Sequence, residues 1–168
     1  MVEFSCSSKR VTRQGTIDNF KRNEEQILEL SGYFLKLKAD SNEIFFEPHS
    51  NRYTISIGLP NWAVDPDHPY KVGRDIKLKS AEMDTFLKAL GWTTNTVLIL
   101  KDMLNKANCE SISSQGDCLQ LNYATDDICS FYYFVLNKPF ADSTIEKDTK
   151  GGITFLRNNV RIGSSCAL

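Results

Sequence analysis

The chain has 168 residues, a formal charge of −1, 41% hydrophobic residues and 24% charged residues. These values are typical of a soluble globular domain and do not favour a nucleic-acid partner, because phosphate binding requires a basic face. The longest apolar runs, Val97–Leu100 and Phe131–Leu136, are far shorter than the roughly 18 residues of a membrane span.

The start of the chain predicts a flexible polar tail over residues 1–14, followed by a single α+β domain over 15–168. No secretory signal is visible, because Glu3 stands where an apolar region is expected. Ser5–Lys9 resembles the first residues of a mature bacterial lipoprotein, in which Cys6 would carry the lipid. Glu3 departs from the aliphatic residue expected before that cysteine. The sequence therefore favours a cytoplasmic protein and leaves open a lipid-anchored protein of the bacterial cell envelope.

A first helix is expected from Thr16, which can cap it, to about Leu30, with Gly32 ending it. Three segments that alternate apolar and polar residues follow, and this period predicts a three-stranded β-meander. The expected strands are Tyr33–Ala39, Glu43–Glu47 and Arg52–Leu59. In the register that also pairs opposite charges, Phe46 faces Tyr53 and Ile44 faces Ile55.

An αα-hairpin is the clearest helical prediction. Ser80 caps its first helix, Gly91 ends it, and a second helix runs to about Ala107. A β-hairpin follows, formed by Cys109–Ser113 and Asp117–Tyr123, with Ile112 opposite Leu119.

The strand expected over Ile128–Leu136 is apolar on both faces, which is typical of a central strand covered on both sides. Ile153–Ile162 supplies one more strand or a bent pair. The sum is an α+β fold: a largely antiparallel sheet, comprising the meander and C-terminal hairpin strands, packed by an N-terminal helix and the central αα-hairpin.

The five cysteines form an odd set without the spacing of metal ligands; they are Cys6, Cys109, Cys118, Cys129 and Cys166. Such a set favours reduced, structural thiols in a reducing compartment.

The stretch between the meander and the αα-hairpin is irregular, and long loops of this kind are often functional. This stretch contains the densest mix of aromatic, acidic and imidazole groups in the chain, which makes it a candidate binding site. The residues of the site are Trp62, Asp65, Asp67, His68 and Tyr70. The acidic residues and His68 are possible metal ligands, but no third group has ligand spacing, so neither a metal nor a cofactor is expected. No catalytic residue is assigned.

Two further features indicate a partner surface. Phe45 is expected on the outward face of the meander. Tyr132 and Phe134 share a face with Gln120 and Asn122, and we expect the αα-hairpin to cover this face. Left uncovered, it would indicate protein–protein contact.

The sequence therefore favours a non-catalytic binding or accessory protein that acts through contact with another protein. One alternative is a small hydrolase or thiol enzyme built around the Trp62–Tyr70 loop, in which His68 or His49 activates Cys129 or Cys109. The other is the lipid-anchored envelope protein tethered through Cys6. Partner, substrate and oligomeric state are not readable from the sequence.

Overall fold

The computed structural model describes residues 12–37, 43–58, 71–125, 129–145 and 153–166. Its helices and strands follow one another as α1 (Arg13–Leu37), β1 (Ile44–His49), β2 (Arg52–Ile57), β3 (Lys71–Lys77), α2 (Ala81–Leu90), α3 (Thr94–Ala107), β4 (Ser111–Gln115), β5 (Cys118–Thr125), β6 (Cys129–Leu136), β7 (Phe155–Arg157) and β8 (Val160–Cys166).

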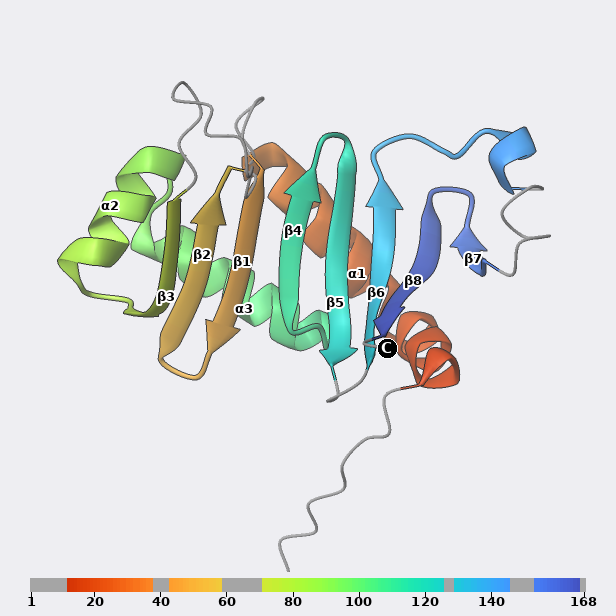
Figure 1. Cartoon of the computed structure of the whole chain (residues 1–168), viewed down its shortest axis with the longest axis horizontal. Coiled ribbons are helices and arrows are strands. Elements are labelled where there is room, and N and C mark those ends of the chain that lie inside the picture. The colour runs from red at the N-terminus through yellow and green to blue at the C-terminus, as the bar shows by residue number, and fades with distance from the viewer. Residues whose placement is uncertain (1–11, 38–42, 59–70, 126–128, 146–152, 167–168) are drawn as a thin grey trace, which may run out of the picture.

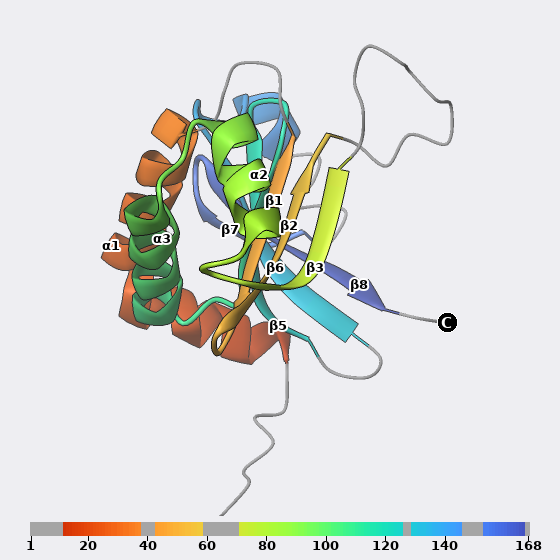
Figure 2. The same ribbon diagram turned by 90° about the vertical axis from the view of Figure 1, so that its left-hand side faces the viewer.

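The strands form one eight-stranded sheet in the order β3-β2-β1-β4-β5-β6-β8-β7, and every neighbouring pair is antiparallel. Figure 1 shows the sheet with β3 at one edge and β7 at the other. The three helices lie together on one side of it (Figure 2). This two-layer arrangement confirms the predicted α+β class with an antiparallel sheet and an αα-hairpin.

Helix α1 is longer at both ends than the sequence predicted. It includes Arg13 and Gln14, which were assigned to the tail, and it continues through Tyr33–Leu37, which was expected to be a strand. That expectation was wrong because the segment also fits the helical period: Ile27, Leu30 and Phe34 are fully buried at spacings of three and four residues. A kink at Asn23, where φ is −122°, lets the long helix change direction.

The meander exists, but its third strand is β3 rather than the segment before β1. Its register also differs from the prediction by two residues, because Ile44 lies opposite Ile57 and Phe46 opposite Ile55. The chain reverses between His49 and Arg52, which lie opposite each other, and Ser50 in this turn adopts a positive φ of 49°. A shift of two residues keeps every side chain on its predicted face.

The β4–β5 hairpin shows the same difference. Ile112 lies opposite Leu121 rather than Leu119. The turn begins at Gly116, with φ of 56°, so a tighter turn again moves the register by two residues. Strand β6 is central, as predicted, between β5 and β8, and the expected bent pair is present as β7 and β8.

The αα-hairpin is confirmed together with its capping residues. The Ser80 side chain accepts a hydrogen bond from the Met83 backbone, and Gly91 ends α2 in the left-handed conformation. Helix α3 begins with a capping box between Thr93 and Thr96.

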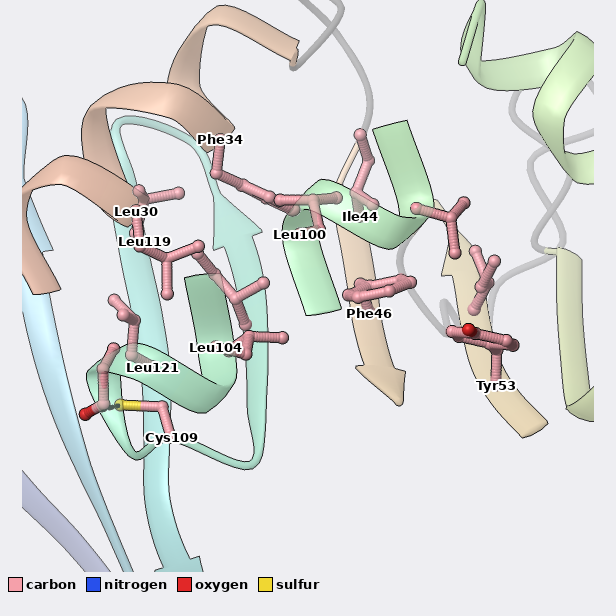
Figure 3. Close-up of a cluster of buried hydrophobic side chains, with 14 of the residues drawn as sticks. Leu30, Phe34, Ile44, Phe46, Tyr53, Leu100, Leu104, Cys109, Leu119 and Leu121 are labelled. Carbon is pink, nitrogen blue, oxygen red and sulfur yellow. Dashed lines mark hydrogen bonds between the residues drawn. The ribbon is translucent and has the colours of Figure 1, made fainter. Parts of the chain in front are cut away.

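The core lies between the helices and one face of the sheet. Leu30 and Phe34 of α1 and Leu100 and Leu104 of α3 lie against the strands, as Figure 3 shows. Trp92 closes one end of this core, with ring contacts to Phe34 and Phe46. Burial of these side chains is the main stabilising contribution.

A polar cluster centred on the buried Asn19 joins three elements within this core. The side-chain amide of Asn19 donates hydrogen bonds to the Tyr133 hydroxyl at 3.0 Å and to the Ala107 carbonyl at 3.3 Å. The Tyr133 hydroxyl in turn donates to the Thr16 carbonyl at 2.8 Å. Asn23 and Asn108 each donate to the Asn19 side-chain oxygen at 2.8 Å. The cluster therefore fixes α1 against both the end of α3 and strand β6.

The cysteines differ in their state. Cys109 and Cys118 are free thiols, as predicted. Cys129 is in a disulfide, so the expectation of a reduced thiol was wrong for this residue. In the β6–β8 ladder its Cα lies opposite that of Cys166. Directly opposed residues of antiparallel strands lie about 4.5–5.5 Å apart, within the Cα separation that a disulfide spans.

We expect digestion without reductant to release Cys129 in a disulfide-linked pair of peptides. Cys166 is opposite it in register, so the peptide that contains residue 166 is the expected partner. Mass spectrometry of the digest makes the measurement. Alkylation of Cys129 in unreduced, unfolded protein would contradict this expectation.

Replacing Tyr133 with Phe should lower the free energy of unfolding by about 1–3 kcal/mol, because it removes one hydrogen-bond partner of the buried Asn19 amide. Urea denaturation measures the change. Tyr123→Phe is the matched control: Tyr123 is also buried and its ring contacts that of Tyr133 at 6.4 Å, but no hydrogen bond of its hydroxyl is found within the described part of the chain. Equal losses in the two variants would mean that the cluster contributes nothing specific.

Candidate functional site

The side of the sheet opposite the helices is called the open face here. Phe46 is fully buried beneath the helices, so its neighbour Phe45 points to the open face. Starting from Phe45, successive Cα partners on neighbouring strands form one row across the sheet. From β3 to β7 its residues are Val72, Ser56, Phe45, Ser113, Gln120, Phe134, Arg161 and Phe155. From β3 to β8 this row extends over about 29 Å, at roughly 4.8 Å per strand.

An aromatic cluster with one arginine occupies the β6–β8 end of the open face. The Tyr132 and Phe134 rings meet edge to face, with centroids 5.0 Å apart. The Arg161 guanidinium lies over Phe134 at 5.0 Å and over Phe140 at 5.6 Å. Phe140 also contacts Phe155 at 5.2 Å. Cation–π and edge-to-face contacts hold this cluster in one arrangement and present both apolar and cationic groups.

Gly163 on β8 makes this arrangement possible. A Cβ atom at this position would lie 2.2 Å from Cε2 of Tyr132 and 2.7 Å from Cε2 of Phe134. Both rings therefore lean across the strand in the space where another residue would have its side chain.

The expected cover over Tyr132 and Phe134 is absent. The αα-hairpin packs on the other face, where Tyr133 is fully buried and Val135 is 3% exposed. Tyr132 and Phe134 are only half-buried, and helices α1, α2 and α3 lie on the other side of the sheet (Figure 2). The prediction that the hairpin covers this face was wrong, because the alternating side chains of β6 direct Tyr133 and Val135, rather than these two rings, toward the helices.

Acidic groups gather at a different place, on β1 and just before β4. The Glu47 and His49 side chains lie 2.9 Å apart, measured between Oε2 and Nε2. Burial raises the pKa of Glu110, and hydrogen bonds from Thr125 partly offset the rise. Strands β5 and β6 separate this acidic group from Arg161.

The described thiols are poorly suited to nucleophilic catalysis. Burial, with a smaller contribution from Glu110, raises the pKa of Cys109 to about 12. Burial also raises the pKa of the half-buried Cys118, although Arg161 acts in the opposite direction. Cys129 is in a disulfide. His49 is paired with Glu47, and its side chain is 55% exposed.

Most of the predicted loop site lies outside the described residues; this applies to Trp62, Asp65, Asp67, His68 and Tyr70. Phe45 is the one predicted binding residue that is described, and it lies on the open face between Ser56 and Ser113. Within the described ranges, no group of three His, Cys, Asp or Glu side chains is arranged to hold a metal ion.

Sequence reasoning missed Arg161 and Gly163. Both belong to β8, and their proximity to Tyr132 and Phe134 depends on the β6–β8 pairing. The available signal was the alternation of Arg161, Gly163 and Ser165 with Val160 and Ile162, which matches a strand with one exposed face.

Comparisons with protein families, curated proteins and solved structures found no match to this chain. None of the described helices combines the length and apolar character needed to cross a lipid bilayer.

We expect iodoacetamide at pH 8 to modify Cys118 in the folded protein much faster than Cys109. A pKa of about 12 leaves only about one Cys109 thiol in ten thousand ionised at that pH, and the thiol is also buried. Peptide mass spectrometry over a time course measures the two rates. Comparable rates in the folded protein, with equal rates after unfolding as the control, would contradict the assignment of Cys109 as an inert core residue.

Proposed function

We propose that this chain is a non-catalytic binding protein that contacts another protein through the open face of its sheet. The observation that carries the proposal is the one-sided packing: helices α1, α2 and α3 cover one face, whereas Phe45, Tyr132, Phe134 and Arg161 lie on the other. Aromatic residues and arginine are the types enriched at protein interfaces and at their energetic hot spots.

The dimensions of the open face support this proposal. A standard interface buries about 800 Å² on each partner, which corresponds to a patch roughly 30 Å across. The row from Val72 to Arg161 has a similar extent, at about 29 Å. Small polar residues, Ser56 and Ser113, flank Phe45 in this row.

Two observations favour this function over a thiol enzyme. The described thiols have raised pKa values, which disfavours the thiolate that such an enzyme needs. Cys129, one of the two nucleophiles considered from the sequence, is in a disulfide. No observation on the described residues favours a hydrolase.

The disulfide also bears on the compartment. Stable disulfides form and persist in oxidising environments and are rare in the cytosol. The disulfide at Cys129 therefore supports an oxidising location, such as a bacterial cell envelope, over the cytoplasm that the odd set of cysteines favoured. Cys6, the proposed lipid attachment site, lies outside the described residues.

Co-purification tests the proposal: proteins that elute with the tagged, unaltered chain are compared with those that elute with tagged surface variants. Val72 and Leu98 are exposed to nearly the same degree, at 43% and 45%, but Val72 belongs to the open-face row and Leu98 to helix α3. We expect Val72→Glu and Phe45→Ser to reduce a stoichiometric partner protein at least about fivefold, and Leu98→Glu to leave it unchanged.

Mass spectrometry of the eluted proteins gives the readout, and circular dichroism checks that each variant is folded. A wild-type protein that elutes alone would contradict the proposal. So would a partner that is lost equally in Leu98→Glu, because its binding would then not depend on the open face.

A further inference from the structure

A groove of about 300 Å³ lies between α1 and α3, where these two helices pack side by side (Figure 2). The described residues that line it recur on each helix at spacings of three or four; they are Gln26, Glu29 and Tyr33 of α1 and Ile99, Asp102, Met103 and Lys106 of α3. The first and last of these positions on each helix are about two helical turns, or roughly 10 Å, apart. The groove therefore follows both helices instead of forming a single point-like pocket.

The floor of the groove is apolar. Tyr33, Ile99 and Met103 are half-buried, so each exposes part of an apolar side chain. Leu30 and Leu104, on the inner sides of the same two helices, are fully buried. Since the core fills the inner side, the groove opens on the outer side of the helix layer, away from the sheet.

The rim of the groove carries more negative than positive charge. Asp102 and Lys106 form an ion pair at 2.7 Å, and their side chains are 61% and 65% exposed. The hydrogen bond and the charge of Asp102 raise the pKa of Lys106, and the charge of Glu29 adds to this rise, so Glu29 lies near the same rim. Within the described part of the chain, no ion pair of Glu29 itself is found.

A second carboxylate adds to this negative charge. Glu25 precedes Glu29 by four residues on α1, and both side chains are exposed. Like charges at this spacing repel each other and disfavour the helix slightly. A cation bound beside Glu29 would relieve this repulsion as well as pair with Glu29 directly. The groove thus combines an apolar floor with a net attraction for a positively charged group.

We infer that this groove binds an amphipathic helix of another protein, with apolar residues on one face and lysine or arginine beside them. Apolar side chains three or four residues apart on that helix would lie on Tyr33, Ile99 and Met103, and a neighbouring basic side chain would pair with Glu29. The inference goes beyond the proposed function, because it concerns a second contact on the opposite side of the molecule.

The shape and the charge of the groove both favour a helix as the occupant. A third helix packs between two others when its side-chain ridges enter the groove that the two form. Met103 is flexible and can adapt to the side chains that it meets. A nucleic acid or an anionic membrane surface fits less well, because phosphate groups would face Glu29 and Asp102.

The probe is an acetylated and amidated peptide of alanine and glutamine, about 18 residues long, which is enough to form a helix on binding. It carries two leucines four residues apart and lysines at the positions beside them. Titration into the ¹⁵N-labelled full chain should shift the amide resonances of Glu29, Tyr33 and Met103 most strongly. The same peptide with glutamine in place of each lysine should bind about three- to fivefold more weakly, the modest factor expected for exposed ion pairs.

Two variants of the chain locate the charge recognition. Glu29→Gln should reduce the affinity for the lysine peptide to that for the glutamine peptide, and it should leave the glutamine peptide unaffected. Glu82→Gln is the matched control, because Glu82 is also an exposed helical glutamate but belongs to α2 and does not line the groove. The difference between the two peptides should disappear at about 1 M salt, which screens exposed charges.

A third variant tests the apolar floor. Met103→Gln keeps the length of the side chain but removes apolar surface, so it should weaken both peptides about threefold. Circular dichroism checks that each variant is folded. Equal affinities of the two peptides for the unaltered chain, resonance shifts confined to the open face, or no binding of either peptide at about millimolar concentration would overturn the inference.

A second copy of this chain is the competing occupant. Sedimentation equilibrium would then show a dimer that Glu29→Gln dissociates, and this result would also overturn the inference. Val72→Glu alters the open face alone and should leave peptide binding unchanged; a loss of binding in that variant would count against the groove. If the peptide binds as expected but no partner protein depends on the open face, this inference stands and the proposed function fails.

Discussion

The buried Asn19 amide is the point at which the helix layer and the sheet are held in one relative position. Apolar packing between α1 and the strands is non-directional, so by itself it tolerates sliding of one layer over the other. The hydrogen bonds from Asn19 to Tyr133 and to the carbonyl of Ala107 have defined geometry and lie in a fully buried environment. If α1 moved to a different position on the sheet, these hydrogen bonds would break and their buried polar groups would be left without partners, which costs free energy. The kink at Asn23, whose side chain donates to Asn19, belongs to the same constraint.

Fixing α1 on Tyr133 also determines which face of β6 remains open. Tyr133 faces the helices, so its neighbours Tyr132 and Phe134 must face the other way. In most one-sided sheets the solvent face of such a strand is polar. On β6 this face carries two aromatic rings instead. Arg161 of β8 stacks over Phe134, and Gly163 of β8 has no side chain in the space that both rings occupy. This accommodation of two rings on the open face is the feature on which the proposed contact with a partner rests.

The sequence was sufficient where local rules decide the structure and insufficient where competing rules fit equally well. Ser80 and Gly91 mark a helix because their capping chemistry is local, and α2 has these ends. Tyr33–Leu37 satisfies both an alternating and a helical pattern, and only the burial of Phe34 beside Leu30 favours the helix. Both hairpins kept their faces but moved by two residues, since alternation fixes the face and the turn fixes the register. Phe45 could be placed outward by parity alone, whereas the aromatic cluster around Phe134 needs the long-range pairing of β6 with β8.

That pairing also determines how rigid the aromatic cluster on the open face is. Tyr132 and Phe134 belong to β6, Arg161 and Gly163 belong to β8, and the two strands are paired from Cys129 to Val135 without a register shift. The disulfide at Cys129 adds a covalent constraint at the start of β6. A site whose walls are ordered before binding loses little conformational entropy when it is filled. The aromatic cluster of the open face is therefore ordered before any partner binds.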